Sequence, residues 1–256
     1  MARAIMTTDT RQKDVAVRLK INGKDVTIGG ITKGAGMIAP NLATMLCFIT
    51  TDAAIPAPLL GECLRKSAET SFNRITIDGH TSTNDTIAII ANGASGITIS
   101  PNGSEGKIFQ QGLDYVTSYL AKAIVRDGEG ATKFIQIDVV GARSRADAVK
   151  IARSIADSPL VKTAINGEDP NWGRIVSAAG YAGVNLDESK TNLYINDILI
   201  FSKGVPTQDN LSVISASMKA KDINLRLELG LGSSADTIWT CDLSHEYVTI
   251  NAEYHT

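Results

Sequence analysis

The segment from residue 33 to residue 46, KGAGMIAPNLATML, carries the residue types and spacing that could do chemistry. Its glycines allow close backbone approach or strained dihedral angles, and Pro40 fixes the chain shortly before Ala43 and Thr44. The Thr44 hydroxyl is a candidate nucleophile, although a free hydroxyl needs an activating base. A plainer interpretation is a loop that leads into a buried strand, with Thr44 as an ordinary β-branched strand residue. The residue types alone favour this plainer interpretation.

Other motif patterns in the chain are incomplete. The segment 230–235 resembles a dinucleotide-binding fingerprint, but that motif requires a helix directly after it, and the strand-like segment 237–241 follows instead. We therefore expect a hairpin turn at 230–235. His245-Glu246 begins an HExxH pattern, but Thr249 takes the place of the second histidine, so no metal site is expected. The chain contains neither a P-loop sequence nor a GxSxG nucleophile elbow.

Composition and charge limit the class of protein. The 256 residues are 43% hydrophobic and 20% charged with a net charge of −2, which is typical of a globular protein that does not bind nucleic acid. The three cysteines include no CxxC pair, so neither a disulfide framework nor structural zinc is expected, and a reducing cytoplasm fits best. No apolar run approaches the roughly 18 residues of a membrane span, and residues 1–10 lack a signal-peptide core.

The elements that must position these residues alternate between short strands and helices. Two hairpins are predicted, because Asn22-Gly23 and Asn196-Asp197 stand between apolar strand segments and tolerate positive φ angles. Further strands are expected at 75–77 and 87–91, both buried, and at 134–140, 224–229, 237–241 and 247–251. Helices are expected at 59–73, 109–127, 145–157 and 211–219, the third capped by Ser144. The block 169–174 is expected to be a structural turn.

The order of these elements predicts an α+β fold. There are enough strands for two packed β-sheets flanked by helices. No internal repeat, low-complexity tract or clear linker is visible, so composition marks no domain boundary.

Several dispersed blocks of the sequence resemble one known family. Segment 33–46 looks like the autocleavage motif of the ornithine acetyltransferases, the bifunctional glutamate N-acetyltransferases of arginine biosynthesis. The other matching blocks, in chain order, are ARAIMTTDT (2–10), SFNRITIDG (71–79), TSTNDT (81–86), DGEGATK (127–133), DPNWGRI (169–175) and YVTINAEYHT (247–256). The resemblance covers essentially the whole chain.

The resemblance implies a self-processing enzyme. In that family the peptide bond before the threonine breaks, so cleavage at Ala43-Thr44 would separate 1–43, the end of an α chain, from 44–256, a β chain that begins with the nucleophile. The freed α-amino group of Thr44, with a reference pKa of about 7.7–8.0, would act as the base. An αββα-like fold of the N-terminal-nucleophile type and a cytoplasmic α2β2 heterotetramer are expected.

The implied activity is acetyl transfer from N2-acetylornithine to glutamate through an acetyl-Thr44 intermediate. The implied substrate-site residues are Thr7, Lys33, Thr44, Glu129, Asn251 and Thr256. Lys33 suits an α-carboxylate as a point charge, and Glu129 could face the δ-ammonium of ornithine. Thr7 and Asn251 could bond to polar substrate edges. No cofactor is expected, and the use of acetyl-CoA as an acetyl donor is left open.

One departure from the family keeps alternatives open. Family members carry a further segment before the point where this chain begins, and that segment holds a Thr-Gly pair that resembles an oxyanion hole. The alternatives are a related self-processed aminopeptidase or amidohydrolase, and an unprocessed, non-catalytic fragment. Without the resemblance, Lys33 is a solvated loop cation, Glu129 a helix-end residue, and Asn251 and Thr256 belong to a frayed tail.

Overall fold

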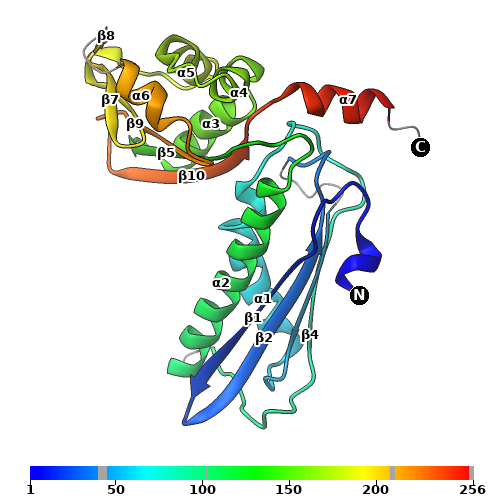
Figure 1. Cartoon of the computed structure of the whole chain (residues 1–256). Helices are drawn as coiled ribbons and strands as arrows, with labels where there is room; N and C mark the ends of the chain where they lie inside the picture. Colours follow the sequence, from blue (N-terminus) through cyan, green and yellow to red (C-terminus); the bar gives the residue numbers. More distant parts are fainter. Residues whose placement is uncertain (40–44, 102, 208–210, 254–256) are drawn as a thin grey trace. The chain divides into compact units, whose positions relative to one another are not determined.

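The protein has an α+β fold with two mixed β-sheets, each flanked by helices (Figure 1). The computed structural model describes residues 1–39, 45–101, 103–207 and 211–253. The chain forms two compact units, Met1–Gly128 and Glu129–Thr256. This boundary is distinct from the expected division into 1–43 and 44–256, which concerns cleavage of the chain and stays a prediction.

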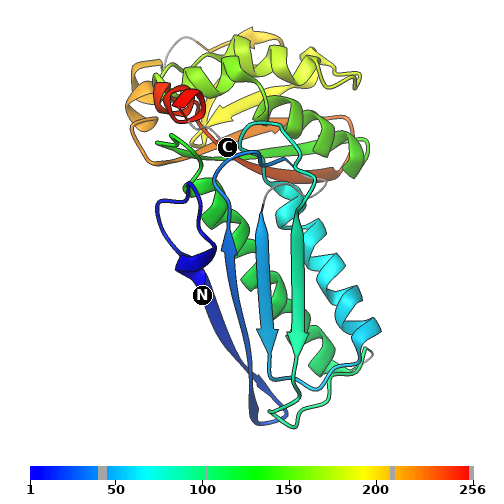
Figure 2. The ribbon, with the colours of Figure 1, turned by 90° about the vertical axis from the view of Figure 1, so that its right-hand side faces the viewer.

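The sheet of the first unit has the strand order β1-β2-β3-β4 (Figure 2). Its strands are β1 (Lys13–Ile21), β2 (Lys24–Lys33), β3 (Leu46–Thr51) and β4 (Thr86–Ala91). β1, β2 and β3 pair antiparallel in succession, whereas β4 runs parallel to β3. The register sets Lys33 opposite Leu46 and Leu46 opposite Thr86. The end of β2 and the starts of β3 and β4 therefore lie side by side.

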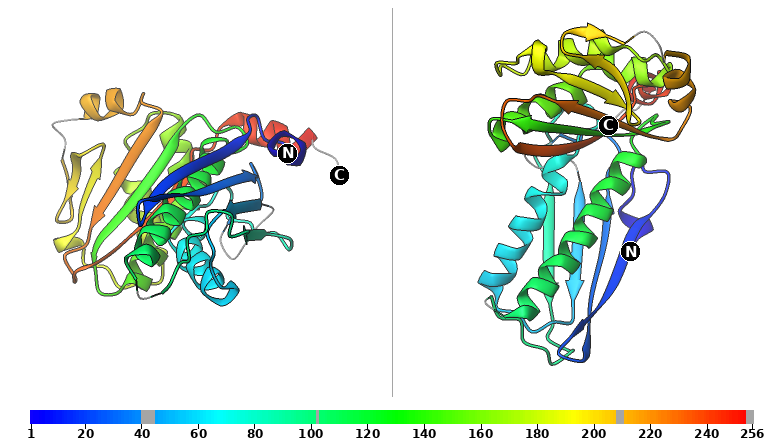
Figure 3. Two further views of the ribbon diagram at one scale, coloured as in Figure 1. Left: turned by 90° about the horizontal axis from the view of Figure 1, so that it is seen from below. Right: turned by 90° about the vertical axis from the view of Figure 1, so that its left-hand side faces the viewer.

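Two helices, α1 (Ala57–Glu69) and α2 (Ser104–Arg126), cover one face of this sheet (Figure 3, right). α2 packs on β1 and β2, and α1 packs on α2 and on β4. Gly30 makes the close approach of α2 to the sheet feasible, because a Cβ atom there would lie 2.9 Å from the Leu120 side chain. Two short 3-10 helices, η1 (Ala2–Ile5) and η2 (Phe72–Arg74), complete the described unit.

The sheet of the second unit has the order β10-β5-β9-β6-β7-β8. Its strands are β5 (Phe134–Ala142), β6 (Asn192–Ile195), β7 (Ile198–Ser202), β8 (Val205–Pro206), β9 (Asp222–Glu228) and β10 (Ser234–Cys241). β5 and β9 are parallel, and the other neighbours are antiparallel. The helices are α3 (Arg145–Ala156), α4 (Pro159–Asn166), α5 (Trp172–Gly180), α6 (Leu211–Ser217) and α7 (His245–Glu253), with η3 (Glu188–Lys190) between α5 and β6. α3 packs on β5 and β10 over an aliphatic core.

Both predicted hairpins are confirmed. β1 and β2 turn at Asn22 (φ 51°) and Gly23 (φ 78°), and β6 and β7 turn at Asn196 (φ 49°) and Asp197 (φ 63°). The Ser144 hydroxyl accepts the N–H of Asp147 at 3.1 Å, which confirms the predicted cap of α3. The strands expected at 87–91, 134–140, 224–229 and 237–241 and the helices expected at 109–127, 145–157 and 211–219 are present with small shifts in their ends.

The strand expected at 75–77 is wrong, although its burial is confirmed. Ile75 and Ile77 are 1% and 2% exposed but belong to no strand of the sheet. The Ile77 N–H donates instead to the Ile38 carbonyl at 2.7 Å. The expectation that the neighbouring strand β4 is buried is also wrong, since Ile90 is 64% exposed and β4 lies at the edge of the sheet. The helix predicted at 59–73 ends at Glu69, before η2.

The strand expected at 247–251 is also wrong, because these residues form part of helix α7. Its β-branched residues favour a strand, but the Ser244 hydroxyl accepts the Glu246 N–H at 3.2 Å at the start of the helix. The local cap therefore outweighs side-chain propensity. Here Asn251 lies on a helix rather than on a strand.

One prediction about a turn fails in the second unit, and another is incomplete. The segment 230–235 is not a hairpin turn, since β5 lies between β9 and β10 in the sheet. The block 169–174 is not only a turn, since the Asn171 side chain accepts the Arg174 N–H and caps α5. Helix α4, with Pro159 at its start, was not predicted.

Candidate active site

The predicted nucleophile and cleavage site lie outside the described residues, and so do two of the six predicted substrate residues, Thr44 and Thr256. Ala43 and Thr44 fall in the gap 40–44, and Thr256 falls in 254–256. The structure does describe the backbone on both sides of the first gap. The hydrogen bonds that fix Ile38, before the predicted cleavage site, and Met45, after it, are therefore described below.

Lys33 ends β2 and is 8% exposed, so the interpretation of this residue as a solvated loop cation is wrong. In the β2–β3 register Lys33 stands opposite Leu46, two residues after Thr44 in the sequence. Its ammonium acts electrostatically on the carboxylate of Asp85. A lysine fixed on a strand in this way presents a localised positive charge for a carboxylate.

A buried ion cluster holds the chain on the N-terminal side of this region. The Lys13 ammonium bonds to Asp9 at 2.5 Å and to Asp127 at 2.6 Å, and all three side chains are at most 3% exposed. Asp9 also accepts the backbone N–H of Thr7 at 3.2 Å and of Gly34 at 2.8 Å. One buried carboxylate therefore connects the segment of Thr7 with the residue directly after Lys33.

The ionisation of Asp9 follows from these contacts. Burial by itself raises the pKa of the Asp9 carboxyl, but the bond from Lys13 and the N–H groups of Gly34 and Thr7 more than offset burial. The pKa of Asp9 consequently lies below its ordinary value, and the cluster contains an ion pair. Sequence reasoning did not single out Asp9, Lys13 or Asp127, although both aspartates stand in the matching blocks.

The loop after Lys33 is held by a second carboxylate. Asp78 accepts the N–H groups of Met37 at 2.7 Å and Ile38 at 3.1 Å. Met37 has a positive φ of 53°, which is uncommon for a side chain of this size and is stabilised here by that bond. The Thr76 hydroxyl also donates to the Ile38 carbonyl at 3.2 Å. Block 71–79 thus fixes the chain that enters the undescribed segment.

A third carboxylate holds the chain that leaves that segment. Asp85 accepts the Met45 N–H through Oδ1 at 2.7 Å, while its Oδ2 is buried and has no partner among the described residues. Burial raises the pKa of Asp85 to about 6, although the Met45 N–H and the charge of Lys33 both oppose the rise. Sequence reasoning missed this residue. Its signal was an aspartate in TSTNDT, directly before a strand.

In the second unit the structure brings Glu129 and Asn251 together. The Asn251 side-chain amide donates to Glu129 Oε2 at 2.9 Å, and Asn251 lies two residues before Glu253, the last described residue. The two side chains are exposed at this contact. The interpretation of Asn251 as part of a frayed tail is therefore wrong, because its side chain is bonded to Glu129.

Close packing around Gly130 aligns that pair. Gly130 has φ of 68°, and a Cβ atom there would lie 2.4 Å from the Tyr247 backbone nitrogen, so only glycine fits without a shift. The Ser244 hydroxyl donates to the Gly130 carbonyl at 2.6 Å. The buried Asp242 carboxylate accepts the N–H groups of Thr132 and Lys133, both at 2.8 Å. These bonds tie α7 to the loop that carries Glu129.

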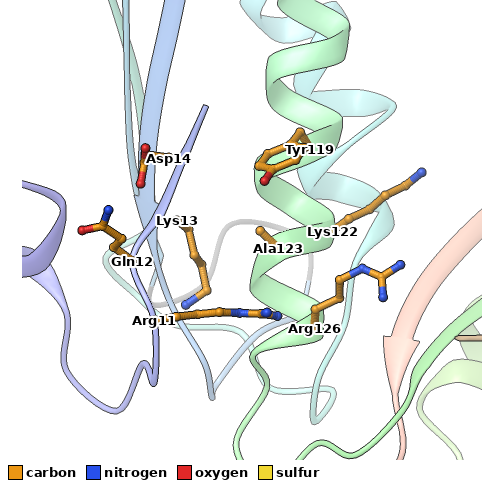
Figure 4. Close-up of a pocket in the computed structure, with 8 residues that line it drawn as sticks. All are labelled: Arg11, Gln12, Lys13, Asp14, Tyr119, Lys122, Ala123 and Arg126. Carbon is orange, nitrogen blue, oxygen red and sulfur yellow. The ribbon is translucent and has the colours of Figure 1, made fainter. Parts of the chain in front are cut away.

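A cavity of about 430 Å³ lies between β1 and α2 (Figure 4). Its lining residues are Arg11, Gln12, Lys13, Asp14, Tyr119, Lys122, Ala123 and Arg126. The Lys13 ammonium is bound by Asp9 and Asp127, and none of the predicted substrate residues that the structure describes lines the cavity. We therefore assign no role in substrate binding to this cavity.

The predicted site residues thus fall into two groups. Thr7 and Lys33 belong to the first unit, where Asp9 connects their segments, and Glu129 and Asn251 bond to each other in the second unit. The first group offers a fixed positive charge, and the second offers an exposed carboxylate and amide. Among the described residues no helix is long and apolar enough to cross a bilayer.

Comparison with known proteins gives a consistent result. The ArgJ family matches residues 1–256. Glutamate N-acetyltransferase from Methanocaldococcus jannaschii is 48% identical over 265 residues, covering 100% of this chain and 65% of that protein. The arginine biosynthesis bifunctional protein ArgJ from Dehalococcoides mccartyi is 49% identical over 256 residues, covering 100% of this chain and 63% of that protein. The chain therefore spans somewhat less than two thirds of the length of these relatives.

A solved structure is also similar. The crystal structure of the arginine biosynthesis bifunctional protein argJ from Bacillus halodurans superposes with a TM-score of 0.78 at 39% identity, over 81% of this chain and 98% of that chain. The family match covers every residue and agrees with the resemblance seen in the dispersed blocks. This chain belongs to the ArgJ family.

Proposed function

We propose that this chain carries the glutamate N-acetyltransferase activity of arginine biosynthesis and moves an acetyl group from N2-acetylornithine to glutamate. The observation that carries the proposal is the family match over residues 1–256, with a relative named glutamate N-acetyltransferase at 48% identity. The carboxylates that hold the chain before and after Thr44 support it, because a nucleophile needs a fixed backbone.

The first step of the proposed mechanism is self-cleavage. The Thr44 hydroxyl oxygen attacks the carbonyl carbon of Ala43, the Ala43-Thr44 C–N bond breaks, and the nitrogen takes up the hydroxyl proton. Water then hydrolyses the resulting ester, which frees the Ala43 carboxylate and restores the Thr44 hydroxyl. Thr44 is left with a free α-amino group beside its hydroxyl, so that nucleophile and base sit on one residue.

The cleaved enzyme would work by a ping-pong cycle. The Thr44 oxygen attacks the acetyl carbon of N-acetylornithine, the C–N bond breaks, and the ornithine α-nitrogen takes the proton. The α-amine of glutamate then attacks the acetyl ester, so that N-acetylglutamate leaves and the Thr44 hydroxyl is restored. Lys33 would bind the α-carboxylate that both amino acids share, and Glu129 would bind the δ-ammonium of ornithine. Asn251 would orient Glu129, and Thr7 and Thr256 would bond to polar edges of the substrate.

Three finer features belong to the same proposal. Acetyl-CoA would be a second acetyl donor, with glutamate as acceptor and without a resident cofactor. The two cleavage products would assemble as an α2β2 heterotetramer. The enzyme would work in the cytoplasm, where its amino-acid substrates are made.

Intact mass under denaturing conditions tests the cleavage, and incubation with N-acetylornithine and glutamate tests the transfer. Two species that divide at Ala43-Thr44, followed by a mass gain of one acetyl group on the larger species, are expected. A single uncut species without transfer would contradict the proposal and favour the non-catalytic fragment. Release of free acetate in place of N-acetylglutamate would favour the amidohydrolase.

A further inference from the structure

Asp9 joins two segments that carry predicted substrate residues. Thr7 lies in the loop between η1 and β1, and Lys33 is the last residue of β2. Asp9 Oδ2 accepts the Thr7 N–H at 3.2 Å, and Asp9 Oδ1 accepts the N–H of Gly34, the residue after Lys33, at 2.8 Å. Each oxygen of one carboxylate group therefore holds one of the two segments.

The bond to Gly34 supplies a constraint that the sheet does not. The β2–β3 pairing ends at Lys33 and Leu46, and Gly34 lies beyond it with a φ of 145°. Glycine has the widest choice of backbone conformations and loses the most conformational freedom when it is fixed. The Asp9 side chain therefore holds the backbone that leaves Lys33 at the point where the regular pairing of the strand stops.

A buried cation fixes Asp9 in turn. Lys13 begins β1 and stands opposite Thr32, the residue before Lys33, in the β1–β2 register. The Lys13 ammonium bonds to Asp9 Oδ1 at 2.5 Å and to Asp127 Oδ2 at 2.6 Å. Charge-assisted bonds between buried groups are strong, and the lowered pKa of Asp9 keeps its carboxylate ionised and able to accept all of these bonds. The acceptor atoms of Asp9 are therefore rigidly placed.

We propose that Asp9 is a positioning residue for substrate binding, which presents the Thr7 hydroxyl and the Lys33 ammonium together to the part that both substrates share. This inference rests on the proposed function, which makes Thr7 and Lys33 substrate residues. Asp9 touches no substrate in this role, because its side chain is 0% exposed. It acts by pre-organising the site, so that less conformational freedom is lost when a substrate binds.

This role predicts a particular change in the kinetics. N-acetylornithine and glutamate share the α-carboxylate, so loosening Thr7 and Lys33 should weaken the binding of both substrates by a similar factor. A change that weakens the ground state and the transition state alike raises KM and leaves kcat nearly unchanged. Glu129, by contrast, is proposed to bind only the δ-ammonium of ornithine. Loss of the Asp9 carboxylate should therefore differ from loss of the Glu129 carboxylate in its effect on glutamate.

The test compares Asp9→Asn with the matched control Asp127→Asn in the full chain. Both variants remove a carboxylate from the same cation, Lys13, but the backbone N–H that Asp127 accepts, at 3.1 Å, belongs to Thr10 and not to a predicted substrate residue. Asp127 lies two residues before Glu129 in the sequence, so the deciding measurement is the KM for glutamate, which Glu129 is not proposed to bind. Both kcat and KM are measured by steady-state kinetics per cleaved chain, and folding is checked by thermal unfolding.

In Asp9→Asn an NH2 group replaces one of the two acceptor oxygens, so one of the two backbone bonds is lost. We expect the KM for N-acetylornithine and the KM for glutamate each to rise about tenfold, while kcat changes by less than about threefold. Asp127→Asn should also lower Tm, because it too disrupts the buried cluster, but it should leave the KM for glutamate within about twofold of the wild-type value.

A KM for glutamate that stays near the wild-type value in Asp9→Asn, or that rises equally in Asp127→Asn, would overturn the role of Asp9 while leaving the proposed function intact. If Asp9→Asn does not fold, Asp9→Glu decides the same question, because it keeps the charge beside Lys13 and displaces both acceptor oxygens. A raised KM for both substrates in Asp9→Glu supports the role, and an unchanged KM contradicts it. Absence of transfer in the wild type would overturn the proposed function, and this inference with it.

Discussion

The two groups of predicted site residues are built in different ways. In the first unit, Lys33 is 8% exposed on a strand, next to a buried cluster in which Lys13 bonds to two carboxylates. In the second unit, Glu129 and Asn251 meet in an exposed contact on helix α7 and the loop it packs against. Buried, charge-assisted bonds hold a backbone rigidly, whereas exposed side chains adjust at little cost. We therefore expect the first unit to determine whether the reaction occurs, and the second to determine which amine is bound.

The largest effect should come from the nucleophile. Thr44→Ala removes the hydroxyl that both cleavage and transfer require, so intact mass should show one uncut chain, and transfer should fall by roughly 10⁴-fold or more. Thr44→Ser is the control, because it keeps a hydroxyl and should still cleave. Normal turnover in Thr44→Ala would contradict the expectation that the first unit determines whether the reaction occurs.

Lys13→Met tests the buried cluster. It leaves Asp9 buried without its cation and Asp127 with the longer ion pair to Arg11 at 3.7 Å. We expect a loss of about 3–5 kcal/mol in the free energy of unfolding, measured by urea titration. The control is Lys20→Met on the same strand, because Lys20 pairs with Asp25 at an exposed site and should matter much less.

The loss from Lys13→Met should also depend on pH. The lowered pKa of Asp9 means that its contribution to stability is full above the unfolded value of 3.8 and disappears as the pH falls through the lower folded value. The gap between wild type and Lys13→Met should therefore narrow below about pH 4. If Lys13→Met and Lys20→Met lower the free energy of unfolding equally, then the buried cluster is no more stabilising than the exposed Lys20–Asp25 pair.

Lys33→Ala should weaken both substrates, because both carry the α-carboxylate that this lysine is proposed to bind. We expect kcat/KM for N-acetylornithine and for glutamate to fall by about a hundredfold each, measured by steady-state kinetics. Lys24→Ala, at the exposed start of the same strand, is the control. Unchanged kinetics for either substrate would contradict this role of Lys33.

Glu129→Gln should affect the binding of N-acetylornithine and of glutamate differently. Loss of the carboxylate removes the partner of the ornithine δ-ammonium, so the KM for N-acetylornithine should rise about tenfold while the KM for glutamate changes little. Glu246→Gln, in the first turn of α7, is the control for a change of charge on the same helix. An equal rise for both substrates would mean that the second unit does not select the amine.

The smallest expected effect is a pH dependence of stability at Asp85. Its folded pKa of about 6 lies above the ordinary aspartate value of 3.8, so ionisation in the folded state is unfavourable and wild-type stability should fall as the pH rises from 4 towards 7. Asp85→Asn lacks this titration, so urea titrations at several pH values should show the variant gaining on the wild type over that range. A constant difference between the two proteins would contradict the raised pKa.

Much of the fold could be predicted where a local signal is strong. The Asn22-Gly23 and Asn196-Asp197 turns, the Ser144 cap and the long apolar periodicity of α2 each depend on residues close in sequence. The prediction failed where β-branched residues indicated a strand but a local cap or a distant partner decided the structure. Segment 247–251 has β-branched residues but is helical, and 75–77 is buried without being a strand.

By itself, the sequence determined the α+β class, the two hairpins, the family and the candidate residues Lys33, Thr44 and Glu129, because these depend on local pattern or on motif order. Only the tertiary structure decided that β5 separates β9 from β10, that Asp9 connects Thr7 to Gly34, and that Asp85 holds Met45. The physical reason is that a buried carboxylate takes its partners from whichever N–H groups the fold brings near. For Asp85 and Met45, 40 residues apart, no local pattern encodes that choice.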